Sequence, residues 1–217
     1  MIFRMARSSL WYRRCHLEVG ARRPSSTSPS CDARHGVHRA SRPAAVLRRC
    51  GVLIVVSGLP GTGKSAVAAD VAGGLGAVQL SIDEAEDAML GAGLASGWET
   101  GVAAYEVTRA FAEQNLALGR IVVVDAVNDS EPARQTWRGA AARAGSGLRF
   151  VVLTCSDRQE HRRRLEGRRR GLRHLPEPTW AHVEALAYAP WTDPHLVVDT
   201  VAPLDTVVEA VLGFSRG

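Results

Sequence analysis

The sequence predicts an α/β fold in which helices cover both faces of a parallel β-sheet. One observation is an apolar, mostly β-branched run at residues 52–57 that lacks polar alternation, as expected for a strand buried on both faces. Another is that similar runs recur at 119–125, 149–154 and 195–199, separated by segments of helix-forming composition. With 217 residues, the chain is long enough for one α/β domain and an appendage.

The run at 52–57 leads into a glycine-rich loop, residues 58–65, which reads G-x-x-x-x-G-K-S. Glycines let backbone N–H groups turn inward around a polyphosphate, and the helix expected at about 64–75 directs its positive dipole end at the same charge. We expect Lys64 to reach the β- and γ-phosphates and Ser65 to offer its hydroxyl to Mg²⁺. The alternative is a glycine-rich turn without a ligand. The predicted nucleotide-binding residues are Gly58, Leu59, Pro60, Gly61, Thr62, Gly63, Lys64, Ser65 and Ala66.

A short second strand is expected at 77–82, and Asp83 follows it directly. Ligands bind outside the carboxyl ends of strands in open parallel sheets, so Asp83 is placed to face a γ-phosphate and its acceptor. The competing interpretation is structural, because Asp83 and Glu86 also form a capping box at the start of a helix. The two roles are compatible.

Residues 91–101 are rich in glycine and carry Trp98, which predicts either a substrate lid or a flexible connection. A long helix is expected at about 102–118, with Val107, Phe111 and Leu118 on one apolar stripe. Tyr105, four residues before Arg109, is a candidate for contact with the substrate. The alternative is a core tyrosine beside a solvated arginine.

The run at 119–125 ends in Asp125, the pattern of a carboxylate that holds the Mg²⁺ shell next to Ser65. No glutamate follows Asp125, whereas hydrolytic motor ATPases commonly place a water-activating glutamate there. A helix is then expected at 131–144; it carries Arg134, a second candidate for contact with the substrate.

The most basic part of this half of the chain is an Arg-rich lid, about residues 158–178. Arg164 and Arg168 are four residues apart, so on a helix they share one face, where guanidinium groups suit the transferring phosphoryl oxygens. For Arg162, Arg169, Arg170 and Arg173 we expect solvated side chains. A helix from Trp180 to about Tyr188 and a closing helix at 204–214 complete the predicted elements.

Residues 1–49 form the second predicted unit, a disordered basic extension to a domain at 50–217. Residues 1–50 hold 11 Arg against Glu18 and Asp32, a balance of +9; the whole chain is +5, so residues 51–217 carry −4. This argues against the domain as a nucleic-acid binder on charge alone. The extension fits a transit peptide, a basic arm that attracts nucleic acid or a start codon placed too far upstream, and we favour the last.

Composition excludes several classes of protein. The four cysteines are scattered without a C-x-x-C pair, which disfavours a disulfide framework or a zinc site and makes a reducing cytoplasm the default. No apolar run approaches the roughly 18 residues needed to span a membrane. Lys64 is the only lysine, so the [N/T]-K-x-D element of guanine-specific GTPases cannot be built.

The order of these features resembles the small P-loop kinases often labelled AAA-family ATPases or predicted kinases, relatives of gluconate kinase, chloramphenicol phosphotransferase, zeta toxin and the polynucleotide 5′-kinases. The resemblance covers about residues 52–212. It is carried by residues 58–65, 81–83, 105–107, 119–128, 134 with 137, 155–157, 161–168, 178–180, 190–191 and 199–200.

This resemblance implies a P-loop NTPase three-layer sandwich whose five-stranded parallel sheet has the order 2-3-1-4-5. It also implies that Asp83 is a general base, that Arg164 and Arg168 are lid arginines, and that the loop after Asp199 lies near the adenine. Several relatives have an arginine three residues after the catalytic aspartate. This chain has Glu86 there, so binding of an acceptor phosphate by that route is not implied.

The leading hypothesis is therefore an ATP- and Mg²⁺-dependent kinase that phosphorylates a hydroxyl group of a small molecule, with Lys64, Asp83, Arg164 and Arg168 as catalytic residues and Asp83, Tyr105 and Arg134 facing the substrate. The alternatives are a nucleic-acid 5′-hydroxyl kinase, and a nucleotide-dependent ATPase or switch without a phosphoryl acceptor. We expect no membrane-spanning segment and no membrane partner.

Overall fold

A computed structural model describes residues 51–216; the expectations for residues 1–49 lie outside this range. Its five strands form one parallel sheet in the order β2-β3-β1-β4-β5, which confirms the predicted order. The strands are β1 (Val52–Gly58), β2 (Val78–Ser81), β3 (Ile121–Asp125), β4 (Gly147–Thr154) and β5 (His195–Asp199). The helices are α2 (Lys64–Leu75), α3 (Ile82–Gly91), α4 (Trp98–Ala117), α5 (Glu131–Ala144), α6 (Arg158–Gly167), α7 (Trp180–Ala185) and α8 (Leu204–Arg216).

The sheet is organised around β1, which pairs with β3 on one side and β4 on the other. Val55 lies between Val124 of β3 and Phe150 of β4 in the register, and all three side chains are buried. A strand with neighbours on both edges and helices on both faces has no polar environment, which explains the unbroken apolar run.

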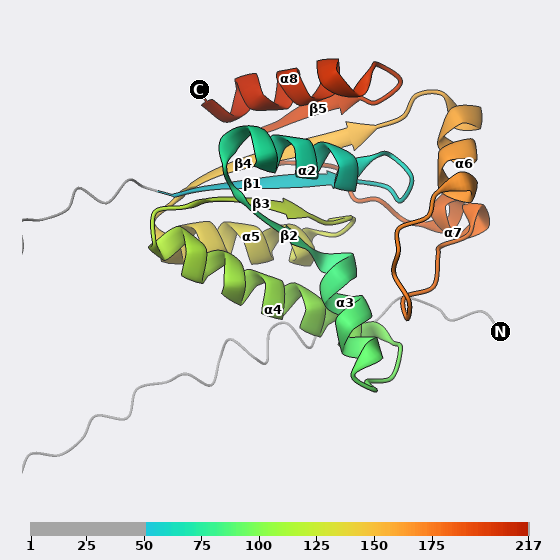
Figure 1. Ribbon diagram of the computed structural model, residues 1–217, viewed down its shortest axis with the longest axis horizontal. Helices are drawn as coiled ribbons and strands as arrows, with labels where there is room; N and C mark the ends of the chain where they lie inside the picture. Colours follow the sequence, from blue (N-terminus) through green and yellow to red (C-terminus); the bar gives the residue numbers. More distant parts are fainter. Residues whose placement is uncertain (1–50, 217) are drawn as a thin grey trace, which may run out of the picture. The chain divides into compact units, whose positions relative to one another are not determined.

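Helices cover the sheet in two layers (Figure 1). Helices α2 and α8 pack on one face and α4 and α5 on the other, and α3 packs against α4 at the edge where the strands end. Alternate residues of β1 enter opposite cores: Ile54 and Val56 face α2 and α8, whereas Leu53 and Val55 face the other layer. The predicted three-layer sandwich is thus confirmed.

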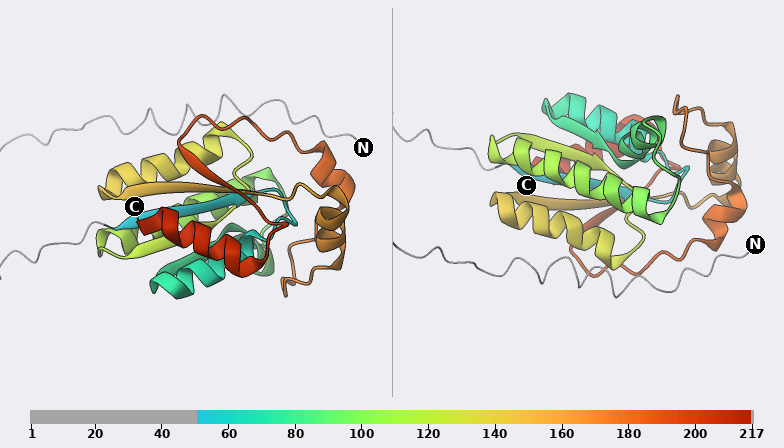
Figure 2. Two further views of the ribbon diagram at one scale, coloured as in Figure 1. Left: turned by 90° about the horizontal axis from the view of Figure 1, so that it is seen from above. Right: turned by 90° about the horizontal axis from the view of Figure 1, so that it is seen from below.

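All strands end at the same edge of the sheet, where the loop after β1, the start of α3 and the helices α6 and α7 gather (Figures 1 and 2). We call residues 168–178, which run between α6 and α7, the lid loop. In Figure 1 it descends from α6 beside α3. This edge carries most of the predicted site residues.

Helix α4 differs from the prediction at its start and in its buried face. It begins at Trp98 rather than at 102, and Thr100 Oγ donates to the carbonyl of Ala95 (2.7 Å) within the first turn. Val107, Phe111 and Leu118, predicted to lie on or near one apolar stripe, are 39%, 51% and 69% exposed. Small residues face the sheet instead, namely Thr100, Ala104, Thr108 and Ala112, which allows close packing.

The other boundaries lie close to the predictions, except that α7 ends at Ala185 instead of about Tyr188. Within residues 51–216 no helix is both long enough and apolar enough to cross a membrane.

Two glycine substitutions test the packing of β1 and α2. A Cβ atom on Gly58, whose φ is +146°, would lie 2.4 Å from the carbonyl oxygen of Leu153. We expect Gly58→Ala to lower the free energy of unfolding by about 1–3 kcal/mol or more in denaturant titration. Gly73, in α2 with open space around it, is the matched control, and Gly73→Ala is expected to raise stability by roughly 0.5–1 kcal/mol. Equal effects at both positions would contradict this account of β1.

Candidate nucleotide-binding and active site

The loop after β1 has a backbone shaped to receive an anion. Gly61 and Gly63 have φ values of +91° and +86°, which only glycine adopts readily. Thr62 Oγ and Lys64 Nζ both donate to the carbonyl oxygen of Leu59, at 2.8 and 3.1 Å. The lysine therefore lies across the loop, at the N-terminus of α2. This conformation agrees with the one that the G-x-x-x-x-G-K-S motif predicts.

Lys64 is buried, and burial lowers the pKa of its ammonium group. Asp125 and Asp83 oppose this shift in pKa by their negative charge, whereas Arg168 and Arg170 reinforce it. Residues from α2, β3, α3 and the lid loop therefore act electrostatically on one cation. A dense cluster of opposite charges of this kind is typical of a site for a polyanion and a metal.

Ser65 and Asp125 were predicted to hold the metal, and the structure brings them together. Ser65 Oγ donates to Asp125 Oδ2 at 2.5 Å, and burial raises the pKa of the Asp125 carboxyl. Mg²⁺ prefers oxygen ligands and commonly uses one or two protein groups together with phosphates. A hydroxyl and a carboxylate beside the phosphate-binding loop fit that requirement. Within residues 51–216, no group of three or more His, Cys, Asp or Glu side chains is arranged to hold a metal alone.

Asp83 lies in the first turn of α3 and is not its N-cap. Ser81 is the N-cap, and its hydroxyl accepts the backbone N–H of Glu84 at 3.5 Å. The predicted capping box of Asp83 and Glu86 is therefore wrong, because the strand ends one residue earlier than expected. The Asp83 carboxylate, 40% exposed, instead forms an ion pair with Arg170.

Arg170 was expected to be solvated and is not. Its side chain is only 14% exposed and lies between the carboxylates of Asp83 and Glu177. Arg168 also pairs with Glu177, through Nε at 2.8 Å, and its buried Nη2 has no hydrogen-bond partner among residues 51–216. Burial, and then the charge of Arg170, lower the pKa of Arg168. An unpaired guanidinium N–H whose charge acts on Lys64 suits a phosphate oxygen.

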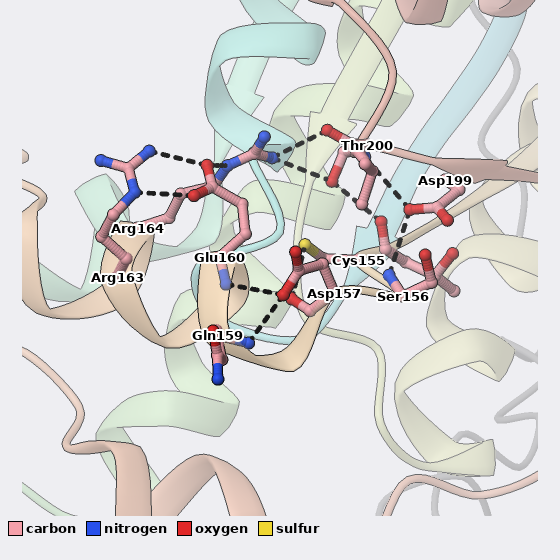
Figure 3. A network of polar contacts seen from close by, with 11 residues as sticks. Cys155, Ser156, Asp157, Gln159, Glu160, Arg163, Arg164, Asp199 and Thr200 are labelled. Carbon is pink, nitrogen blue, oxygen red and sulfur yellow. Dashed lines mark hydrogen bonds and ion pairs between the residues drawn. The ribbon is translucent and has the colours of Figure 1, made fainter.

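Arg164 lies in a different network from Arg168, contrary to the prediction that they share a face (Figure 3). Arg164 Nη1 donates to the carbonyl and the hydroxyl oxygen of Thr200, at 2.8 and 3.3 Å, and its Nε to Glu160 at 2.7 Å. Helical spacing does not apply to the pair, because α6 ends at Gly167 and Arg168 is extended. Arg164 thus joins α6 to the segment after β5, where the resemblance implies that the adenine lies.

The rest of the network in Figure 3 anchors the start of α6. Asp157 caps the helix by accepting the backbone N–H groups of Gln159 and Glu160, at 2.9 and 3.0 Å. Asp199 Oδ1, at the end of β5, accepts the N–H groups of Ser156 and Val201, both at 3.1 Å. Arg163 and Arg164 hold the pKa of Glu160 at about 2. These contacts tie the ends of β4 and β5 to the base of the lid.

His161 links α6 to the phosphate-binding loop. Its Nε2 lies 2.8 Å from the carbonyl oxygen of Pro60, and its ring packs edge-to-face against Trp180 at the start of α7. A Cβ atom on Gly61 would come within 3.1 Å of the His161 ring. His161 was not among the predicted site residues, although its place in the first turn of the helix after β4 was an available signal.

Asn128 is a second residue near the site that was not among the predicted site residues. It is fully buried with a φ of +53°, and its side chain donates to Ser57 Oγ and accepts from Trp137 Nε1, both at 2.8 Å. Its N–H donates to the hydroxyl oxygen of Tyr105 at 3.2 Å. Burial raises the pKa of Tyr105. Tyr105 thus supports the loop after β3.

Arg134 does not face a substrate and was wrongly predicted to do so. It is fully buried, and it donates to the carbonyl oxygens of Asn128, Pro190 and Ala189 at 3.1, 2.6 and 2.5 Å. Its guanidinium also stacks over the ring of Trp191. The guanidinium therefore joins the loop after β3 to the segment before β5. The position of Arg134 on a helix does not reveal this role, because the carbonyl partners come from other parts of the chain.

The phosphate-binding loop, the strand order and the Ser65–Asp125 pair define the P-loop nucleotide-binding class of proteins. Residues 53–190, more than half of the chain, match the AAA domain family, and the chain belongs to it. The Mycobacterium tuberculosis APS kinase CysC in complex with AMPPNP and APS is similar in structure (TM-score 0.62, 22% identity, 77% of this chain and 98% of that chain covered).

Two further solved structures share the fold. A gluconokinase from Sinorhizobium meliloti 1021 has a TM-score of 0.53 at 23% identity, with 78% of this chain and 93% of that chain covered. Chaetomium thermophilum Kti12 in complex with ADP-AlF3 has a TM-score of 0.55 at 19% identity, with 76% and 100% covered. No protein of curated function is detectably similar in sequence.

The bracing role of Arg134 predicts a stability effect. Arg134→Met leaves buried carbonyl oxygens without a donor, so we expect the free energy of unfolding to fall by at least about 1–3 kcal/mol in denaturant titration. Arg138, on the same helix, forms ion pairs with Glu131 and Asp193 nearer the surface, so Arg138→Met is expected to cost at most about 1 kcal/mol. If Arg134→Met kept wild-type stability and lost only affinity for an acceptor, the substrate role would be correct after all.

Proposed function

We propose that this chain is an ATP-dependent phosphotransferase that uses Mg²⁺ to move the γ-phosphoryl group of ATP to a hydroxyl group of a small molecule. The observation that carries the proposal is the charge cluster around Lys64, to which Asp125, Asp83, Arg168 and Arg170 contribute from separate segments. Phosphoryl transfer depends mainly on positioning and on stabilising charge, and these groups are of the types that it requires.

The residues take the following roles in this proposal. Backbone N–H groups of the loop around Gly61, Gly63 and Lys64, together with the Lys64 ammonium group, bind the β- and γ-phosphates. Arg168 and Arg170 neutralise the charge that spreads over the transferring group. When bound, Mg²⁺ would supply further neutralisation, and Ser65 and Asp125 would hold it.

Asp83 is proposed to accept the proton of the acceptor hydroxyl as the new oxygen–phosphorus bond forms and the bond to the β-phosphate oxygen breaks. Its present partner is Arg170. Asp83 therefore becomes available as a base when Arg170 exchanges this carboxylate for a phosphate oxygen. A charge-assisted pair with 40% exposure at the carboxylate is weak enough for such an exchange.

A small-molecule acceptor is favoured over a nucleic acid because residues 51–217 carry a net charge of −4, which does not attract a polyanion. Two of the similar proteins are named for small molecules, APS and gluconate. The test is transfer of label from γ-labelled ATP across a panel of hydroxyl-bearing metabolites and oligonucleotides. Label on a metabolite supports the proposal. Label on oligonucleotides alone would favour a nucleic-acid 5′-hydroxyl kinase instead. Release of inorganic phosphate that does not depend on any acceptor would favour an ATPase or switch.

Lys64→Ala tests the phosphate-binding loop. Because the ammonium group makes one hydrogen bond within residues 51–216, to the carbonyl of Leu59, we expect the variant to fold and its turnover to fall by at least about 100-fold, as when a preorganised charge is removed from a transition state. The measurement is product formation from ATP, with the melting temperature as the control for folding. Wild-type turnover in Lys64→Ala would exclude this loop as the phosphate site.

Asp83→Asn separates proton acceptance from structure. Since Ser81 rather than Asp83 caps α3, the helix start should survive, with loss of only the ion pair to Arg170. An amide cannot accept the proton, so transfer to the acceptor is expected to fall by roughly 100- to 10,000-fold with little change in ATP affinity. Glu84→Gln, on the same turn, is the matched control and should transfer at the wild-type rate. Transfer that survives in Asp83→Asn would assign the base elsewhere.

A further inference from the structure

We propose that Asp87 is a positioning residue that fixes the lid loop against α3 and thereby determines where Arg168 and Arg170 stand relative to Lys64 and Asp83. The contact itself is independent of the proposed function. Its effect on turnover rests on that function.

The main evidence is that one carboxylate oxygen gathers three consecutive backbone N–H groups. Asp87 Oδ1 accepts from Arg173 at 3.0 Å, His174 at 2.7 Å and Leu175 at 2.8 Å. Hydrogen bonds to an ionised acceptor are about twice as strong as neutral ones. The bonds from Leu175 and His174 hold the pKa of the Asp87 carboxyl below its usual range, so the group is ionised at neutral pH.

A second contact holds the same turn of the lid loop one turn further along α3. A Cβ atom on Gly91 would lie 2.8 Å from the ring of His174, closer than side-chain atoms tolerate. Gly91 is the last residue of α3, so the helix offers His174 a surface without a side chain. The lid loop therefore contacts α3 at both Asp87 and Gly91. Figure 1 shows the loop beside this helix.

Asp87 and Asp83 are four residues apart on α3 and so lie on one face of the helix. Both bind the lid loop, but in different ways. Asp83 binds the side chain of Arg170, whereas Asp87 binds backbone N–H groups only. Glu177 joins Arg168 to Arg170 within the lid loop.

The difference between the two carboxylates matters for the reaction. A phosphate can displace Asp83 from Arg170, because both are anions that compete for one guanidinium. No such exchange applies to Asp87, whose partners are backbone groups of residues 173–175. Asp87 thus keeps the lid loop in place while Arg170 changes partner, and it couples the position of the lid arginines to the helix that carries the base.

Hydrogen exchange measured by mass spectrometry tests the contact directly on the full-length chain. In Asp87→Ala we expect the amides of residues 173–175 to exchange at least about 10-fold faster than in wild type, because the three N–H groups lose their acceptor. Glu84→Ala is the matched control: it also replaces an acidic residue of α3, outside this contact, and should leave that exchange unchanged. Asp87→Asn, which keeps an oxygen acceptor without the charge, is expected to fall between.

Gly91→Ala is an independent variant that presses on His174, and it should speed exchange of the same amides without removing a charge. In the transfer assay, Asp87→Ala is expected to lower kcat by roughly 10- to 100-fold, since misplaced catalytic groups slow the chemical step, while the Kd for ATP stays within about two-fold. Wild-type exchange at 173–175 in Asp87→Ala, or the same acceleration in Glu84→Ala, would overturn the proposal. Absence of phosphotransfer by the wild type would contradict the proposed function and leave the exchange test intact.

Discussion

The structure depends on the close packing of β1 between the neighbouring strands β3 and β4. At its last residue, Gly58, the N–H donates to the carbonyl of Val127 beyond β3 at 3.4 Å, while a Cβ atom would lie 2.4 Å from the carbonyl of Leu153 on β4. Only glycine fits there. The phosphate-binding loop therefore leaves the sheet from its centre, and Lys64 arrives beside Asp125, the last residue of the adjacent strand.

A buried cation at that point requires compensation, and the surrounding elements provide it. Asp125 and Asp83 favour the charge on Lys64, whereas burial, Arg168 and Arg170 oppose it. Glu177 pairs with both arginines, so three acids balance the lysine and the two arginines of this cluster. An anionic phosphate would therefore bind by replacing a carboxylate partner of an arginine, as proposed for Asp83 and Arg170. The Arg170–Asp83 ion pair adds to the contacts that hold the lid loop against α3.

Behind these charges lies a buried polar framework. Asn128 bonds to Ser57 of β1, to Tyr105 of α4 and to Trp137 of α5, and Arg134 ties it to Pro190 before β5. Buried networks with all partners satisfied hold a unique arrangement, since any displacement leaves a polar group unpaired at low dielectric. The loop ends around the site are thus held by this buried polar network.

The sequence alone determined the parallel sheet, the phosphate-binding loop and the pairing of Ser65 with Asp125, because these depend on local patterns: long apolar runs, glycines at fixed spacing and an acid at the end of a strand. The partners of the arginines were decided only by the tertiary structure. Arg134 was predicted to contact the substrate yet is buried, and Arg170 was predicted to be solvated yet pairs with Asp83, 87 positions away. Long side chains choose partners by distance in space, and no local pattern encodes which carboxylate or carbonyl another element will bring within reach.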